Sequence, residues 1–240
     1  MTQQDSYKQH ISAQFNAELE AVKNHLLEMG GKVEQQIANA VEAMLTQDTG
    51  VAEQVVLGDR EVNDMEKMID DECSRILARR QPAASDLRLV LAVAKVTTDL
   101  ERIGDEARKI ARQAIRLAEQ GQSPSNFVEI RHIGRHVAAM LRKALDAFAR
   151  LDVEVAVEVV KEDSEVDGEY GNAMRSLVTY MMEDPRNISP VLDEIWALRA
   201  LERVGDHAAN ISEHVIYLVQ GLDVRHVELD ELVAQVEELR

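Results

Sequence analysis

The sequence predicts an all-α protein: a tandem duplication of two three-helix bundles, with six long helices related by a pseudo-two-fold repeat. The first observation is composition, because 240 residues include only four Pro, eleven Gly and 3% aromatics, with apolar residues at helical spacing almost throughout. The second is that "LERIGDEARKI" at 100–110 returns as "LERVGDHAANI" at 201–211, with seven of eleven letters identical. The third is that "AMLTQDTGVAEQVVLGDREVN" at 43–63 aligns with "AFARLDVEVAVEVVKEDSEVD" at 147–167. Two matches in the same order, at nearly the same shift, indicate a duplication.

Three helices are expected in the first unit. The first covers about residues 10–47 and is expected to be interrupted or kinked at Gly30–Gly31. The second follows the "QDTG" break and runs to "ARRQP". The third begins at Ser85, a residue type that caps helix N-termini, and reaches about residue 119.

Three more helices are expected in the second unit. They cover about residues 127–150, about residues 152–182, and a stretch that ends at Gly221. For this last helix, Ser189 is the expected N-cap and Pro190 the first helical residue.

Short connections between these long helices favour an up-down-up bundle in each unit. The predicted domains are residues 1–120 and 121–221, joined near "GQSPSN". An acidic C-terminal tail follows at 222–240, where a short helix is expected.

The charge of the chain excludes several classes of partner. Lys and Arg number 27 and Asp and Glu number 44, a formal net charge of -17, which repels the phosphates of nucleic acids. There is no clustered basic segment for an anionic membrane surface and no run of about 18 apolar residues for a membrane span. The start of the chain lacks the pattern of a signal peptide. We therefore expect a cytoplasmic protein without membrane insertion.

The single cysteine, Cys73, excludes an internal disulfide and any metal site with several cysteines. Its spacing from Ile69 and Ile76 places it on an apolar helix face.

The repeated phrase carries both a core stripe and acidic pairs. Four apolar residues of each copy fall on one helix face: Leu100, Ile103, Ala107 and Ile110, then Leu201, Val204, Ala208 and Ile211. A mid-helix glycine recurs at Gly104 and Gly205, which indicates the close approach of a backbone or a ligand.

Oxygen-bearing side chains four residues apart occur on two helices of each unit. The pairs in the repeated phrase lie away from the core stripe, and the pairs on the other helix flank an apolar line that in the first unit is Val62, Met65 and Ile69. If these helices are neighbours, the oxygens converge on a cation. The predicted metal ligands are Asp59, Asn63, Glu101 and Asp105 in the first unit and Asp163, Asp167, Glu202 and Asp206 in the second. Oxygen ligands suit magnesium, calcium or manganese, and carboxylate clusters also suit iron. The second site should bind more strongly, because Asp167 adds a charge that Asn63 lacks.

An alternative interpretation of the same pairs is a solvated acidic face that binds nothing, with Arg102, Arg108 and Lys109 balancing charge locally. His207 stands in the place of Glu106 and is interpreted as a surface variation.

Other motifs are weaker. One Glu-x-x-His, Glu129 to His132, is half of what a di-iron bundle needs. No catalytic motif is found, so we do not expect an enzyme. Trp196, Met181 and Met182 are expected in the core.

Several longer phrases resemble the PhoU family, the phosphate-transport accessory and regulatory proteins of bacteria. They are "GDREVNDMEKMIDDECSRILARRQPAASDLRLVLAVAK", "TTDLERIGDEARKIAR", "LVTYMMEDPRNISPVLD" and "ALRALERVGDHAANISEHVIYLVQG". The resemblance spans nearly the whole chain but not its last residues. The resemblance implies two repeated three-helix bundles. It also implies surface clusters of metal ions, iron or zinc among them, held by acidic motifs. These motifs match all of the predicted metal ligands given above except Asn63.

The resemblance also implies a function: a negative regulator of the phosphate-starvation response. Such a protein would be a non-catalytic adaptor between the ATP-binding subunit of the phosphate ABC transporter and a sensor histidine kinase. We also expect a homodimer, and zinc, iron, magnesium or manganese as the bound metal. Two other hypotheses stay open: a carboxylate-bridged metal protein with storage or oxidase activity, and a helical scaffold whose acidic faces only keep it soluble.

Overall fold

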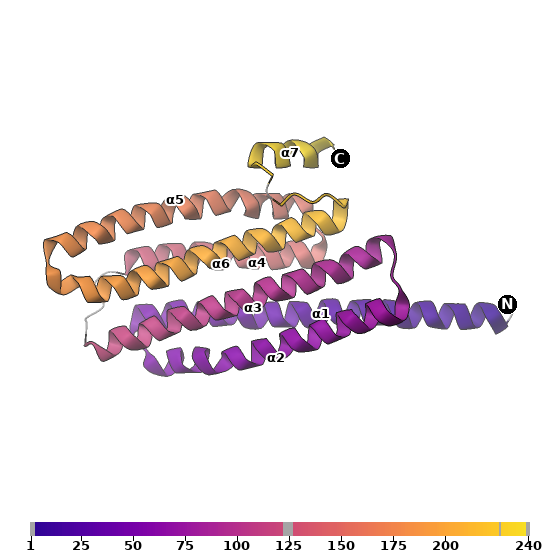
Figure 1. Ribbon diagram of the computed structural model, residues 1–240, viewed down its shortest axis with the longest axis horizontal. Coiled ribbons are helices and arrows are strands. Elements are labelled where there is room, and N and C mark those ends of the chain that lie inside the picture. Colours follow the sequence, from indigo (N-terminus) through magenta and orange to yellow (C-terminus); the bar gives the residue numbers. More distant parts are fainter. Residues whose placement is uncertain (1–2, 122–126, 226, 239–240) are drawn as a thin grey trace.

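The computed structural model describes residues 3–121, 127–225 and 227–238, and within them it confirms the all-α class (Figure 1). The elements are α1 (Gln3–Thr46), α2 (Thr49–Arg80), α3 (Ala84–Glu119), α4 (Val128–Arg150), α5 (Val153–Glu183), a 3-10 turn η1 (Pro185–Asn187), α6 (Ile188–Gln220) and α7 (Leu229–Glu238). Most of the predicted "GQSPSN" linker, residues 122–126, lies outside the described residues, as do residues 226 and 239–240 of the tail.

The six long helices run along the longest axis of the molecule (Figure 1). Helices α1, α2 and α3 pack on one another, and so do α4, α5 and α6. The two sets meet where α3 packs on α6 and where α1 packs on α4. The N-terminal end of α1 extends beyond the other helices, and the short α7 lies against α5 (Figure 1). The predicted boundary near residue 120 falls at the end of α3 and stays a prediction.

The turn between the first two helices has the same backbone conformation in each set. Gln47 and Leu151, which are equivalent in the repeat, both adopt a left-handed backbone, with φ of 55° and 57°. Next along the chain, Asp48 accepts a hydrogen bond from the amide of Val51, and Asp152 caps α5 in the same way. An Asp at the N-cap satisfies amides that the first helical turn leaves unpaired. The same local chemistry therefore builds both hairpins.

The crossing of α1 and α4 shows the same symmetry and overturns one expectation. A methyl group at Gly30 would lie 2.6 Å from the side chain of Leu145, and one at Gly134 would lie 3.0 Å from Val41. Each glycine thus receives the side chain of the other helix at an equivalent position. The interruption predicted at Gly30–Gly31 was wrong, because α1 is continuous there. The glycine serves close packing.

The core is one continuous cluster, and the predicted stripes lie in it. All eight residues of the two repeated stripes are fully buried. Cys73 lies on the buried face with Ile69 and Ile76, as predicted, and burial raises the pKa of its thiol to about 12. The thiol therefore stays protonated at neutral pH.

Both serine caps were predicted wrongly. Helix α3 begins at Ala84, one residue before Ser85, after extended backbone at Ala83 that offers no side-chain cap. Helix α6 begins at Ile188, so Ser189 lies inside it. At α6 the cause is the 3-10 turn η1, which leads directly into the helix and is itself capped by the side chain of Asp184.

Two apolar residues expected in the core are exposed instead. The side chains at Trp196 and Met182 are 60% and 81% exposed, while Met181 is partly buried against the core. Along α6, Ala197 and Leu198 occupy the buried positions, so the preceding Trp196 faces outward.

None of the described helices has the length and the apolar character needed to cross a lipid bilayer.

Candidate metal-binding sites

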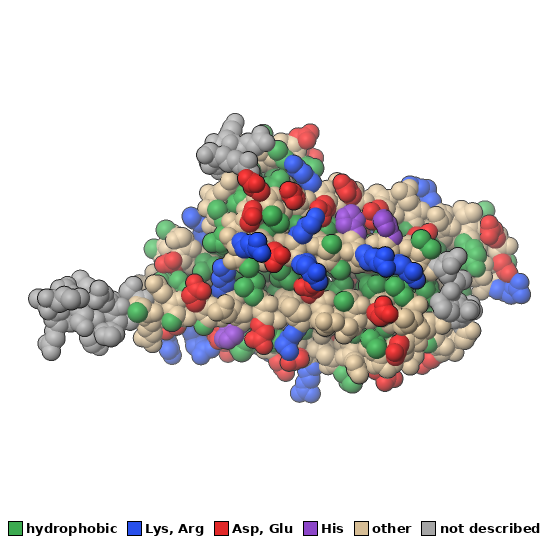
Figure 2. Space-filling model, turned by 180° about the vertical axis from the view of Figure 1, so that it is seen from behind, with side chains coloured by type: hydrophobic (Ala, Val, Ile, Leu, Met, Phe, Trp, Pro, Cys, Tyr) green, Lys and Arg blue, Asp and Glu red, His purple; other side chains and the backbone are tan. Residues whose placement is uncertain are grey.

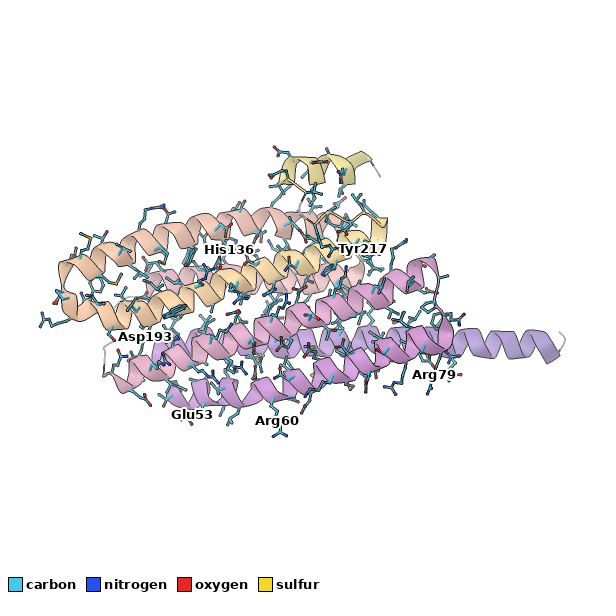
Figure 3. The ribbon with its side chains drawn as sticks, in the orientation of Figure 1. Glu53, Arg60, Arg79, His136, Asp193 and Tyr217 are labelled. Carbon is cyan, nitrogen blue, oxygen red and sulfur yellow. The ribbon has the colours of Figure 1, made fainter. Side chains whose placement is uncertain are left out.

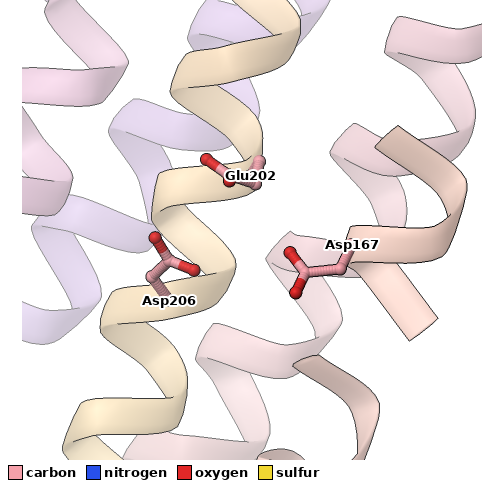
Figure 4. A group of neighbouring side chains, drawn as sticks. All are labelled: Asp167, Glu202 and Asp206. Carbon is pink, nitrogen blue, oxygen red and sulfur yellow. The ribbon is translucent and has the colours of Figure 1, made fainter. Parts of the chain in front are cut away.

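The second acidic site (Asp163, Asp167, Glu202 and Asp206) brings carboxylates from two helices together. Asp167 extends from α5 toward α6, where Glu202 and Asp206 lie on successive turns (Figure 4). One oxygen of each of these three side chains lies within 4.8 Å of the others. The convergence expected from i,i+4 spacing on neighbouring helices is therefore present in this unit.

Asp163 lies one turn before Asp167 on α5 and completes this group from the inside. A methyl group at Gly205 would lie 3.4 Å from its Oδ1 atom. The glycine predicted to mark a close approach thus faces a carboxylate, and not a backbone or a ligand; its equivalent Gly104 faces the side chain of Val62. Burial raises the pKa of Asp163 to about 7, helped by the charges of Asp206, Asp167 and Glu202.

The positive charges near this site do not outweigh burial and the repulsion between its carboxylates. Burial first, and neighbouring carboxylates second, raise the pKa of both Glu202 and Asp206. Arg199 and Arg203 oppose this effect, and Arg203 also pairs with Glu106 at 2.8 Å. The Oε2 atom of Glu202 is buried without a hydrogen-bond partner. Crowded carboxylates with raised pKa values favour either protons or a cation.

The first acidic site (Asp59, Asn63, Glu101 and Asp105) holds a cation of its own, the guanidinium of Arg108. This group lies 2.5 Å from Asp59 Oδ2 and 2.6 Å from Asp105 Oδ1, so it bridges α2 and α3. Asn63 donates to the same Asp59 oxygen at 3.4 Å. Asp59 is only 6% exposed, so it lies deeper than its predicted position at the edge of the apolar line indicated. Two of the four predicted ligands are therefore already neutralised by the protein.

The alignment of the two units contains the reason for this difference. In the repeat, Arg108 corresponds to Ala209, whose side chain has no charge. The local pairing expected of Arg108 is present, since Asp105 is three residues away, but the contact with Asp59 of another helix was missed. Comparing the two copies at positions beside the acids would have shown it.

Glu66 is a further member of the first site that sequence reasoning missed. It is half-buried on α2, and its pKa is raised by burial and by Asp70, with a smaller effect of Asp105. It in turn helps raise the pKa of Glu101, where burial is again the main cause. The signal available was its spacing of seven residues from Asp59, which is two helical turns.

The interpretation of position 207 as a surface variation was wrong. His207 is 6% exposed and lies between α3 and α6, with Nδ1 3.0 Å from Asp99 Oδ1. His214 approaches the other oxygen of Asp99 at 3.4 Å. Burial acts to raise the pKa of Asp99, but the contacts with the two histidines outweigh it and hold the pKa at about 2. This buried cluster joins the two units.

The Glu-x-x-His motif does not build a di-iron centre. The charge of Glu129 helps to raise the pKa of Glu194 on α6, whereas His132 contacts Glu169 on α5. The two residues of the motif thus face different neighbours.

The donor set of the second acidic site fits a hard cation. All four of its side chains are carboxylates, which are the ligands that magnesium and manganese prefer and that ferric iron accepts.

The comparisons with known proteins follow the duplication. A family model described as the PhoU domain matches residues 26–114 and, a second time, residues 130–215. The chain belongs to the PhoU family. The two matches fall on the two helix sets, so each set is one copy of the PhoU domain.

Named PhoU relatives cover almost the whole chain. The phosphate-specific transport system accessory protein PhoU homolog of Pseudomonas aeruginosa is 59% identical over 100% of this chain and 99% of its own length. The accessory protein PhoU of Escherichia coli K12 is 50% identical over 94% of each chain.

Solved PhoU structures agree with the fold. The crystal structure of PhoU from Pseudomonas aeruginosa matches 87% of this chain and 100% of that chain, with a TM-score of 0.85 and 61% identity. The phosphate transport system regulatory protein PhoU from Streptococcus pneumoniae matches 87% and 98%, with a TM-score of 0.80 and 28% identity.

Proposed function

We propose that this chain is a non-catalytic accessory protein of the phosphate-specific transport system that represses the phosphate-starvation response. In this role it links the ATP-binding subunit of the transporter to a sensor histidine kinase, in the cytoplasm and as a homodimer. The observation that carries the proposal is family membership over the full length, because relatives with 50–60% identity are named accessory proteins of that system. Kinase contact and repression are our extension of those names.

An adaptor between two partners needs two contact faces, and two surfaces are available. The acidic sites supply one of them, which we assign to the kinase. The other is the α5–α6 end, an exposed apolar group that consists of Tyr180, Met182, Ile188, Leu192 and Trp196. Exposed apolar groups of this kind mark protein–protein contact sites. We assign this end to the transporter subunit.

We also propose that the second acidic site holds a divalent or ferric ion, such as manganese, magnesium or iron, or else zinc. Its unbalanced carboxylates support this assignment, and Arg108 makes the first site the weaker one. The test is calorimetric titration of manganese into Glu202→Gln/Asp206→Asn and Glu101→Gln/Asp105→Asn variants. We expect the first variant to lose one bound ion and the second to keep it. Equal stoichiometry in both variants and the parent would contradict metal binding at either site.

The regulatory role is tested with a variant in which Glu101, Asp105, Glu202 and Asp206 are all Ala. We expect it to stay helical by circular dichroism and yet to leave phosphate-starvation genes on when phosphate is ample. The matched control carries the same loss of charge at exposed acids elsewhere: Glu53, Asp71, Glu158 and Glu165. Normal repression and normal kinase capture by the folded first variant would show that these faces are not the signalling surface.

A further inference from the structure

Two histidines of α4 contact one carboxylate of α5, and none of the three residues belongs to either acidic site. His132 Nε2 and His136 Nδ1 each lie 3.1 Å from the same atom, Oε1 of Glu169. The His132 side chain is 67% exposed, while those of His136 and Glu169 are 20% and 25% exposed. His136 lies where α4 runs behind α5 and α6 (Figure 3). From the opposite side, Figure 2 shows neighbouring histidines beside acidic side chains on an open face.

The spacing and types of these residues are those of a zinc-class site. Two histidines four residues apart lie on one helix face one turn from each other, which lets both rings bind a single ion. A carboxylate from a neighbouring helix completes a set of two histidines and one glutamate, a set found in zinc sites that keep a fourth position open. His136 already makes a hydrogen bond to Glu169, and His132 lies at the same carboxylate oxygen. The ligand atoms of the three residues do not all lie within 4.8 Å of one another, so His132 has to turn its ring before one ion can reach both histidines.

We propose that His132, His136 and Glu169 bind one borderline divalent ion of the zinc class, with solvent as the fourth ligand. Imidazole nitrogen suits zinc, nickel and cobalt, in contrast to the hard ions that suit the carboxylate sites. The ion takes the place of the two shared contacts, with bonds of about 2.0–2.2 Å. His132 is exposed enough to turn its ring onto the ion. Once bound, the ion fastens α4 to α5.

This zinc-class site is separate from the second acidic site. Glu169 follows Asp167 by two residues, which at 3.6 residues per turn places the two side chains about 200° apart around α5. Asp167 faces α6, whereas Glu169 faces α4. Loss of one site therefore leaves the ligands of the other in place.

The site belongs to the second unit alone. In the alignment that pairs 43–63 with 147–167, the equivalents of the three ligands are Glu28, Lys32 and Met65, which cannot form such a set. The first unit has a different contact, in which His25 Nδ1 lies 2.8 Å from Glu72. No second histidine lies one turn from His25 on either side, so this pair is a natural control.

The experiment uses the full chain with Glu101→Gln, Asp105→Asn, Asp167→Asn, Glu202→Gln and Asp206→Asn, which silences both acidic sites. Zinc is titrated by calorimetry, and cobalt is followed by its visible absorption, which separates four-coordinate from six-coordinate ions. We expect one zinc equivalent to remain and cobalt to give four-coordinate bands. Zinc should also raise the melting temperature, because it links two helices of the folded state.

Adding His132→Ala or Glu169→Gln to that chain should weaken zinc binding by roughly tenfold or more, whereas adding His25→Ala should change nothing. His132 is largely exposed, so its replacement leaves the fold intact, and circular dichroism checks this. The proposal is overturned if the silenced chain binds no zinc. It is equally overturned if its zinc binding survives His132→Ala together with Glu169→Gln, or if His25→Ala removes it.

Discussion

Replacing Arg108 with Ala should lower the stability of the protein, because Arg108 holds the first acidic site together. The guanidinium bridges Asp59 of α2 and Asp105 of its own helix, at 2.5 and 2.6 Å. Without it, Asp59 keeps a carboxylate that is only 8% exposed and has lost its cation. The change therefore removes the main charge pair between α2 and α3 at this level of the bundle.

The magnitude follows from the burial of the two partners. Breaking a fully buried ion pair by removing one partner costs about 3–5 kcal/mol. Arg108 is 25% exposed, so water reaches part of the space it leaves, and we expect about 2–4 kcal/mol. In a chain of this size, 1 kcal/mol moves the melting temperature by about 2–4 °C. Arg108→Ala should therefore lower the melting temperature by roughly 4–16 °C.

The assay is thermal unfolding followed by circular dichroism, in buffer with a chelator, with Arg102→Ala as the control on the exposed side of the same helix. A double variant, Arg108→Ala with Asp59→Asn, should recover more than half of the loss, since it leaves no buried charge. Manganese should raise the melting temperature of Arg108→Ala more than that of the parent, because four acids are then open to it. If Arg108→Ala melts like Arg102→Ala, Arg108 does not hold this site.

Three further predictions concern buried polar and apolar positions. The pKa of Glu194 is raised to about 7 by burial and by Glu129, so stability is lost as pH rises from about 4.5 through 7. Glu194→Gln should stabilise the protein by up to about 3 kcal/mol at pH 8 and hardly at all at pH 4.5; urea titrations that show equal gains at both pH values would disprove this. His207→Ala should cost about 1–3 kcal/mol, because Asp99 loses a partner while buried; an unchanged urea midpoint would count against it. Leu201→Asp puts a charge in the core and should cost more than about 4 kcal/mol, so a native melting curve would refute that placement.

The sequence was sufficient for the features that depend on local chemistry and on helical period. The stripes around Leu100 and Leu201 were found because burial of apolar residues repeats with the turn of the helix. The order of the six long helices followed from where that period breaks. The acidic pairs of the second site were found because carboxylates at i,i+4 on two adjacent helices have only one way to face each other.

Features that depend on which helix lies opposite could not be predicted. The wheel of α6 does not show which of its faces the neighbouring helices cover, so it did not show that Trp196 faces outward at the α5–α6 end. The burial of His207 depends on Asp99, a residue 108 positions away in the chain. A single sequence shows on which face of its own helix a residue lies. It does not show which charged residue of the neighbouring helix that residue contacts.

At the contact between α3 and α6, duplication within one chain lets two equivalent positions hold different residues. Helices α3 and α6 are equivalent in the repeat and pack on each other, so a contact between positions 99 and 207 has an equivalent between 200 and 106. In a symmetric pair of identical units both contacts would have the same residues. Here one is Asp99 with His207, while at the other Ala200 leaves Glu106 to pair with Lys109 and Arg203.

Charged positions that differ between the copies therefore carry information that the identical positions lack. The repeated apolar letters build the same core twice, and the repeated acids place two similar acidic sites. What separates those sites is Arg108 in one copy and Ala209 in the other. The zinc-class residues His132, His136 and Glu169 likewise correspond to Glu28, Lys32 and Met65 in the other copy. In a duplicated helical protein, a change of charge at a half-buried, equivalent position is thus the sequence feature that best indicates where the two halves have taken separate roles.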